Sequence, residues 1–162
     1  MFDRIELLDD KILCGLSIEM SLVENKTRDL WSAFMPQKNS INHLESSDLF
    51  SLQVYNDLFD YKNFNPNQSF IKWAAVEVKS RIDLPDQLQT FDLTAGLYAV
   101  FIHEGTPQEF HKTLSFVFEK WLPESLYEID HRAHFELLKE DYRPDDPEAK
   151  EEVWIPICKK RS

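Results

Sequence analysis

The sequence predicts an α+β domain in which a β-α-β-β unit is repeated in tandem. Three observations lead to this class: two helical stretches share one spacing of apolar residues, each follows a strand-like run, and each precedes two further strand-like runs. Because no crossover helices separate the returning strands, we expect antiparallel sheets with one main helix per half. The repeat also predicts pseudo-twofold symmetry and a central cleft between the halves that could hold a ligand.

The two helical stretches carry the same apolar stripe, and each is followed by a proline. Residues recur at the i, i+4, i+7, i+8, i+11 spacing of one helix face. The first stripe is Val23, Thr27, Leu30, Trp31 and Phe34, before Pro36; the second is Phe110, Leu114, Val117, Phe118 and Trp121, before Pro123. Capping boxes at 21–24 and 106–109 predict both helix starts, and Pro107 suits the first position of the second helix.

Strands are predicted from runs rich in Ile, Leu, Val, Tyr and Phe. They cover residues 11–20, 49–55 and 71–78 in the first half and 97–103, 134–139 and 152–158 in the second. Turn-prone segments at 63–67 and 143–147 separate the last two strands of each half. We therefore expect one domain over 1–162, with half-repeats of about 1–80 and 95–162 and a connection at 81–94 that holds an edge strand at 89–93.

Charge and apolar patterning restrict the partners and the location. The formal net charge of -11 repels a phosphate backbone, which argues against direct nucleic-acid binding. No stretch approaches the roughly 20 apolar residues of a membrane span, and the first residues lack the basic flank and apolar run of a signal peptide. We expect a cytoplasmic protein without a membrane partner. Cys14 and Cys158 lie in apolar runs without CxxC spacing, which predicts buried thiols rather than a disulfide.

Glu136 is the strongest candidate for a functional side chain. Within 134–139, Phe135 and Leu137 alternate with Glu136, so the carboxylate points away from the face that Phe135 packs. Beside apolar and aromatic groups its pKa would be raised unless a cation joined it, and a cationic ligand could supply that charge. The alternative is an ordinary strand glutamate on a solvated face.

Aromatic side chains make up 13% of the chain and include four tryptophans at 31, 73, 121 and 154. Indole faces attract cations and stack on planar compounds. Core packing is the alternative for each ring.

Histidines do not predict a metal site here. His131, His134 and Glu136 form an H-x-x-H-x-E pattern, but strand residues three apart face opposite ways, so His131 would have to lie in a turn. The sequence has no nucleophile elbow, Walker loop or dinucleotide fingerprint. We predict neither a metal nor a cofactor.

Several segments together resemble the GyrI-like small-molecule-binding family, which also forms the effector-binding part of AraC-type and MerR-type multidrug regulators of bacteria. The resemblance covers roughly the whole chain. It rests on 97–105 (LYAVFIHEG), a helix ending in 121–123 (WLP), 135–137 (FEL) and 152–157 (EVWIPI), with 30–36 (LWSAFMP) and 72–78 (KWAAVEV) in the first half.

This resemblance implies a central hydrophobic pocket with aromatic walls and one glutamate that meets positively charged ligands, and that glutamate falls on Glu136. It suggests pocket aromatics at Trp31, Tyr55, Trp73, Tyr98, Phe110 and Trp121. Many relatives are fused to a helix-turn-helix reader, whereas no such module is recognisable here. We therefore expect any role in transcription to act through a protein partner or by sequestering a ligand.

The sequence is compatible with three functions. The first, which we favour, is a sensor or sequestering protein for an aromatic, cationic or lipophilic compound. The second is an enzyme, since some GyrI-like proteins resemble hydrolases that open cyclopropane rings in DNA-alkylating natural products, with Glu136 as general acid or base. The third is a protein-binding module in the manner of a DNA gyrase inhibitor, with the acidic surface as its interface.

Overall fold

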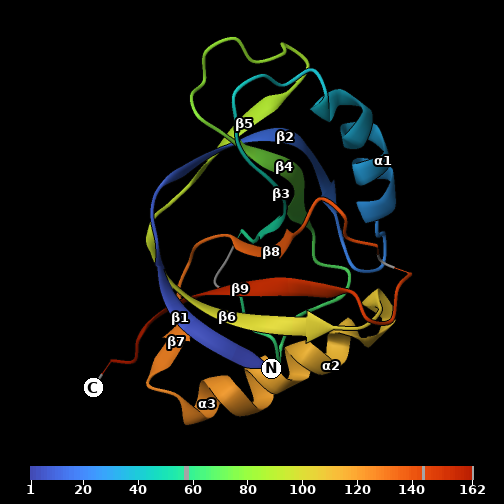
Figure 1. The fold of residues 1–162 in the computed structure, drawn as a ribbon. Coiled ribbons are helices and arrows are strands. Elements are labelled where there is room, and N and C mark those ends of the chain that lie inside the picture. Colours follow the sequence, from blue (N-terminus) through green and yellow to red (C-terminus); the bar gives the residue numbers. More distant parts are fainter. Residues whose placement is uncertain (57–58, 144, 162) are drawn as a thin grey trace.

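One antiparallel sheet organises the residues that the structure, a computed structural model, describes: 1–56, 59–143 and 145–161. Its strands lie in the order β1-β6-β9-β8-β3-β4-β2-β5, and β7 pairs separately with β9 (Figure 1). The strands are β1 (Phe2–Leu8), β2 (Lys11–Met20), β3 (Leu44–Val54), β4 (Phe70–Val78), β5 (Gln89–Leu93), β6 (Gly96–Glu104), β7 (Tyr127–Ile129), β8 (His134–Leu138) and β9 (Lys150–Lys159). The α+β class and the antiparallel pairing are confirmed.

The predicted strands all form, and two more appear. Strands β2 and β5 have the predicted bounds, and β5 lies at one edge of the sheet as expected. Sequence reasoning missed β1 and β7. Strand β1 (FDRIELL) has three charged residues and no regular alternation, and it forms the other edge by pairing with β6, so only its long-range partner reveals it as a strand. Strand β7 has three residues, too few for a periodic pattern.

The first helix, α1 (Thr27–Lys38), begins later and ends later than predicted. Ser21 Oγ accepts a hydrogen bond from the Glu24 backbone N–H at 3.0 Å, but this bond closes a turn ahead of the helix, and Val23 is 62% exposed. Pro36 lies inside α1 rather than beyond it. A proline near the C-terminal end removes one backbone hydrogen bond, which a short last turn can tolerate.

The second helical stretch runs from Pro107 to Glu124. It consists of a 3₁₀ turn, α2 (Phe110–Ser115), a π-helical turn over Phe116–Trp121 and α3 (Leu122–Glu124). The predicted start is right, but the capping bond is absent: the backbone oxygen of Thr106, not its side chain, accepts the Glu109 N–H. Pro123 lies within the helical stretch, so the prediction that it follows the helix is wrong.

Both helices cover the same face of the sheet, at its two ends. The residues Ala74, Ser51, Glu136 and Val153 are directly paired across β4, β3, β8 and β9, so their side chains share one face. Ala74 belongs to the core cluster under α1, whereas Val153 belongs to the cluster under α2. Figure 1 shows α1 beside β2 and β4, and α2 beside β6. Glu136 therefore lies between the two helix-covered regions.

The opposite face of the sheet forms a third core cluster. Its central side chains are Phe50, Leu52, Trp73, Tyr98, Val100, Phe135 and Trp154. The rings of Phe135 and Trp154 stack with centroids 5.1 Å apart. This cluster holds the middle strands together from the side opposite to Glu136.

The two edge strands pair with strands that do not follow them directly into the same hairpin. Strand β1 leads directly into β2 but pairs with β6, and β5 leads directly into β6 but pairs with β2. The N-terminal and C-terminal strands are thus connected at both edges as well as by the β3–β8 pair in the middle.

Gly15 tests how closely β2 and β4 approach. A Cβ atom added at Gly15 would lie 1.9 Å from the backbone oxygen of Ala74, which cannot move without breaking the sheet. We expect Gly15→Ala to lower the free energy of unfolding by about 2–4 kcal/mol, measured by urea denaturation. Glu19→Ala, a change at an exposed residue of the same strand, is the control and should have an effect of about 0.5 kcal/mol or less. Equal midpoints for the two variants would contradict the close approach.

Candidate ligand site around Glu136

Glu136 lies in the middle of β8 with its side chain 14% exposed. Phe135 and Leu137 point to the opposite face and join its core cluster, as strand alternation predicted. The carboxylate therefore faces inward on the helix-covered face, and it is not an ordinary solvated strand glutamate. A charge in this position needs partners.

Two side chains from neighbouring strands supply those partners. Gln53 of β3 donates a hydrogen bond from Nε2 to Glu136 Oε1 at 3.0 Å, and the Lys72 Nζ of β4 lies 3.7 Å from the same oxygen. The Lys72 side chain is 7% exposed. In the strand register Lys72 is paired with Gln53, and Glu136 is paired with the small residue Ser51, whose other partner is Ala74, so the long side chains can meet diagonally across β3.

Burial dominates the protonation of this ion pair. It raises the pKa of Glu136 above its usual value, although Lys72 and Gln53 oppose the shift. It lowers the pKa of Lys72, and here the negative charges of Glu136 and Glu151 oppose the shift. Each group is thus buried at a cost that its partner partly offsets.

Glu151 of β9 is a second carboxylate of the same region. Val153 is paired with Glu136, and Glu151 lies two residues away on β9, so it faces the same side. Burial raises the pKa of Glu151 to about 7, and the negative charge of Glu136 adds to that rise, while a hydrogen bond with Tyr142 lowers it. The group formed by Glu136, Glu151 and Lys72, which we call the acid–lysine cluster, contains one more acid than base.

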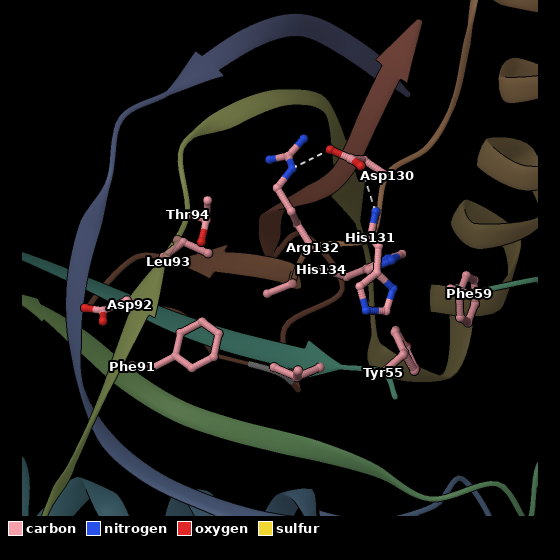
Figure 2. A pocket seen from close by; sticks show the side chains of 12 residues that line it. Tyr55, Phe59, Phe91, Asp92, Leu93, Thr94, Asp130, His131, Arg132 and His134 are labelled. Atoms are coloured by element: carbon pink, nitrogen blue, oxygen red, sulfur yellow. Dashed lines mark hydrogen bonds and ion pairs between the residues drawn. The ribbon is translucent and has the colours of Figure 1, made fainter. Parts of the chain in front are cut away.

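A pocket of about 230 Å³ opens at the end of β3 (Figure 2), and Glu136, Glu151 and Lys72 are not among the residues that line it. It is lined by Val54, Tyr55, Phe59, Phe91, Asp92, Leu93, Thr94, Asp130, His131, Arg132, Ala133 and His134. Arg132 is committed to the fold, since its Nε donates to Asp130 at 2.7 Å and its Nη2 donates to the Ile157 carbonyl at 3.2 Å. The pocket thus has an aromatic part, formed by Tyr55, Phe59 and Phe91, and a polar part that contains Asp92 and the Asp130–Arg132 ion pair.

Tyr55 and His134 link the pocket to the acid–lysine cluster. Tyr55 follows β3 two residues after Gln53, and its ring lies 5.1 Å from that of His134, which is two residues before Glu136. The charge of Glu136 adds to the rise that burial causes in the pKa of Tyr55. Burial lowers the pKa of His134 to about 3, so its ring is neutral at neutral pH. The part of the pocket wall formed by Tyr55 and His134 is thus uncharged at neutral pH, and His134 lies two residues from Glu136 on β8.

The aromatic residues suggested from sequence do not gather in one place. Tyr55 lines the pocket, whereas Trp73 and Tyr98 are buried in the core of the opposite face. Trp31 packs against Phe34 within the α1 region. Phe110 contacts His103, and Trp121 stacks on Phe2 with centroids 5.0 Å apart.

Sequence reasoning missed several residues of this region. Lys72 could have been recognised from the sequence, because a lysine within the otherwise apolar stretch of β4 must be paired if it is buried. Gln53 and Glu151 could not, since their proximity to Glu136 depends on strand register. Phe59, Phe91 and His134 belong to separate segments that only the fold brings together.

Other predicted features can be placed as well. Cys14 is buried and Cys158 is half-buried, and both thiols are free. His131 is exposed, and within the described ranges no three His, Cys, Asp or Glu side chains are grouped as a metal site would require. No helix in the described part of the chain is long and apolar enough to cross a membrane.

Comparison with known proteins identifies the family of this chain. A family model described as "Cass2: Integron-associated effector binding protein" matches residues 4–157. The chain belongs to this family. The resemblance to GyrI-like effector-binding domains is thereby confirmed. As a member of the Cass2 family, the chain carries a domain whose relatives are described as binding effectors.

Individual relatives of this Cass2-family domain are more distant. The transcriptional regulator BrlR of Pseudomonas aeruginosa is 26% identical over 129 residues, which cover 79% of this chain and 45% of BrlR. The chain thus spans less than half the length of that curated relative. The structure of SAV2435 bound to tetraphenylphosphonium has a TM-score of 0.68 at 14% identity, covering 98% of this chain and 94% of SAV2435. The EcmrR C-terminal domain has a TM-score of 0.73 at 10% identity, covering 99% of each chain. These structural likenesses show the fold.

The pKa of Glu151 predicts how stability depends on pH. Because burial raises this pKa to about 7, the folded state holds a proton that the unfolded chain has already lost, and stability falls as pH rises through 7. We expect the change in unfolding free energy between pH 6.5 and 8 to be more negative in the wild type than in Glu151→Gln, by about 1 kcal/mol. Urea midpoints at the two pH values measure it for both proteins. His134 acts in the opposite direction over the same range, but it does so equally in both proteins, so their difference isolates Glu151. An unchanged drop in the Gln variant would contradict the assignment.

Proposed function

We propose that this domain binds a small aromatic, lipophilic cation beside the carboxylate of Glu136. The observation that carries this proposal is the buried, inward-facing carboxylate of Glu136, two residues along β8 from His134, which lines a pocket together with the rings of Tyr55 and Phe59. The acid–lysine cluster supports it, because two carboxylates face one ammonium and a monocation would complete the balance of charge. The lipophilic cation tetraphenylphosphonium in the structurally similar SAV2435 supports the same ligand class.

The pocket gives the aromatic part of the ligand its contacts. Tyr55, Phe59 and Phe91 line it, and their ring faces attract cations and stack on planar groups without requiring one pattern of hydrogen bonds. Its volume of about 230 Å³ is below the roughly 300–1,000 Å³ of most small-molecule sites. A ligand with several rings therefore requires some of these side chains to move.

We also infer that the two half-repeats are related by an approximate twofold axis near the β3–β8 pair. The strand order supports this, because β5, β2, β4 and β3 on one side correspond to β1, β6, β9 and β8 on the other. Such an axis places Glu136 close to the centre of a single domain over 1–162. The ligand site would then lie at the junction of the halves, within reach of side chains from both.

The role that follows is that of a sensor or sequestering protein linked to transcription regulation. The similarity to BrlR supports this link, although BrlR is more than twice as long as the matched part. With a net charge of -11, the chain itself is poorly suited to nucleic acid, so a regulator or another protein such as gyrase is the partner we propose, in the cytoplasm.

Ligand binding tests the proposal directly. We expect tetraphenylphosphonium and a rhodamine dye to bind with micromolar Kd values, and Glu136→Gln to weaken both by about tenfold or more, as the carboxylate is their main source of attraction. Isothermal titration calorimetry and fluorescence quenching measure this. Glu152→Gln is the matched control, since Glu152 is next to Val153 on β9 but faces the other side, where it accepts a hydrogen bond from Trp154. Equal binding by wild type and the Glu136 variant would refute the proposal.

The hydrolase alternative uses the same residue. Burial raises the pKa of Glu136, and a raised carboxyl pKa suits a general acid. This observation supports the hydrolase alternative. It stays a prediction that a cyclopropane-containing alkylating compound would be turned over by the wild type and not by Glu136→Gln. Product formation followed by mass spectrometry separates catalysis from binding.

A further inference from the structure

We propose that Lys72 is the resident counter-ion of Glu136, and that a cationic ligand binds by displacing its ammonium from the carboxylate. Lys72 would then set how tightly the domain binds cations. This inference rests on the proposed function, because it concerns the same carboxylate.

The first observation is the place of Lys72 in the sheet. It lies in the interior of β4, where its neighbours Ile71 and Trp73 point to the core of the opposite face. Its own side chain is 7% exposed and faces the helix-covered side. A lysine this deeply buried is stable only beside an anion.

The second observation is that Lys72 and a bound cation would compete for the same oxygen. The ammonium lies 3.7 Å from Glu136 Oε1, the atom that also accepts the hydrogen bond from Gln53. A second cation beside this carboxylate would be repelled by the ammonium at a short distance and in a poorly solvated place. Binding is therefore weaker than the carboxylate alone would allow.

The third observation is that Glu151 offers Lys72 a second carboxylate. Glu151 lies on the same face, two residues along β9 from the partner of Glu136, and its negative charge acts on Lys72. When a ligand occupies Glu136, the flexible lysine side chain can turn its ammonium toward Glu151. The exchange keeps every charge of the acid–lysine cluster opposite a partner.

A pair of isosteric ions of opposite charge tests this inference. Tetraphenylphosphonium and tetraphenylborate have nearly the same shape, so a change in packing affects both, whereas a change in charge affects them in opposite directions. We expect Lys72→Met to bind the phosphonium about tenfold more tightly than wild type and the borate about tenfold more weakly. Calorimetric titration of the full chain gives each Kd.

The controls separate this inference from the proposed function. Lys11→Met removes a lysine that is also paired with a strand glutamate, Glu77, outside the cluster, and should leave both Kd values within about twofold. If Glu136→Gln fails to weaken phosphonium binding, the proposed function fails. A different result overturns this inference alone: Glu136→Gln weakens phosphonium binding, but Lys72→Met leaves phosphonium binding unchanged or weakens it. In that case the proposed function stands.

A second variant covers the risk of misfolding. Lys72→Gln keeps a hydrogen-bond donor for Glu136 and removes the charge, so it should show the same opposite changes for the two ions. A loss of affinity for both ions in a folded Gln variant, judged by its circular dichroism and thermal melt, would also overturn the inference, since it would indicate a packing role alone.

Discussion

The burial of Glu136 together with Lys72 is the interaction on which the functional part of this structure depends. Neither charge could be taken out of water alone without a large loss of solvation energy. The two meet at 3.7 Å, with Gln53 bound to the same carboxylate oxygen, and the three residues come from three adjacent strands. The register of β4, β3 and β8 must therefore be correct before the cluster can form.

The packing of the sheet maintains that register. On one face, the rings of Phe50, Phe135 and Trp154 lock the middle strands together, and on the other, α1 and α2 cover the two ends. Gly15 lets β2 lie close to Ala74, next to the row that contains Glu136. The edge strands β1 and β5, which pair with β6 and β2, restrain the same arrangement from outside. The carboxylate of Glu136 in the middle of this sheet is therefore held in position by residues that do not contact it.

The relation to the Cass2 family explains the fold more fully than the chemistry of the site. Solved structures of similar fold share between 10% and 14% of their residues with this chain in the two cases described above. At this distance the backbone is kept while individual side chains change, so the balance of charge around the glutamate has to be derived from this chain itself. Here that balance includes an internal ammonium, that of Lys72 beside Glu136.

The sequence by itself determined the class of the fold, most of the strands and the face on which Glu136 lies. These features follow from local periodicity: two residues per repeat in a strand, and about 3.6 in a helix. It misjudged the ends of the helices, because Pro36 and Pro123 are tolerated inside them, and it missed β1, whose partner β6 is more than 90 residues away. Only the tertiary structure decided that Glu136 meets Lys72 and Gln53, that Glu151 lies nearby, and that Tyr55 rather than Trp73 or Tyr98 lines the pocket. The physical reason is that cross-strand contacts depend on register and strand order, which no local pattern in the chain encodes.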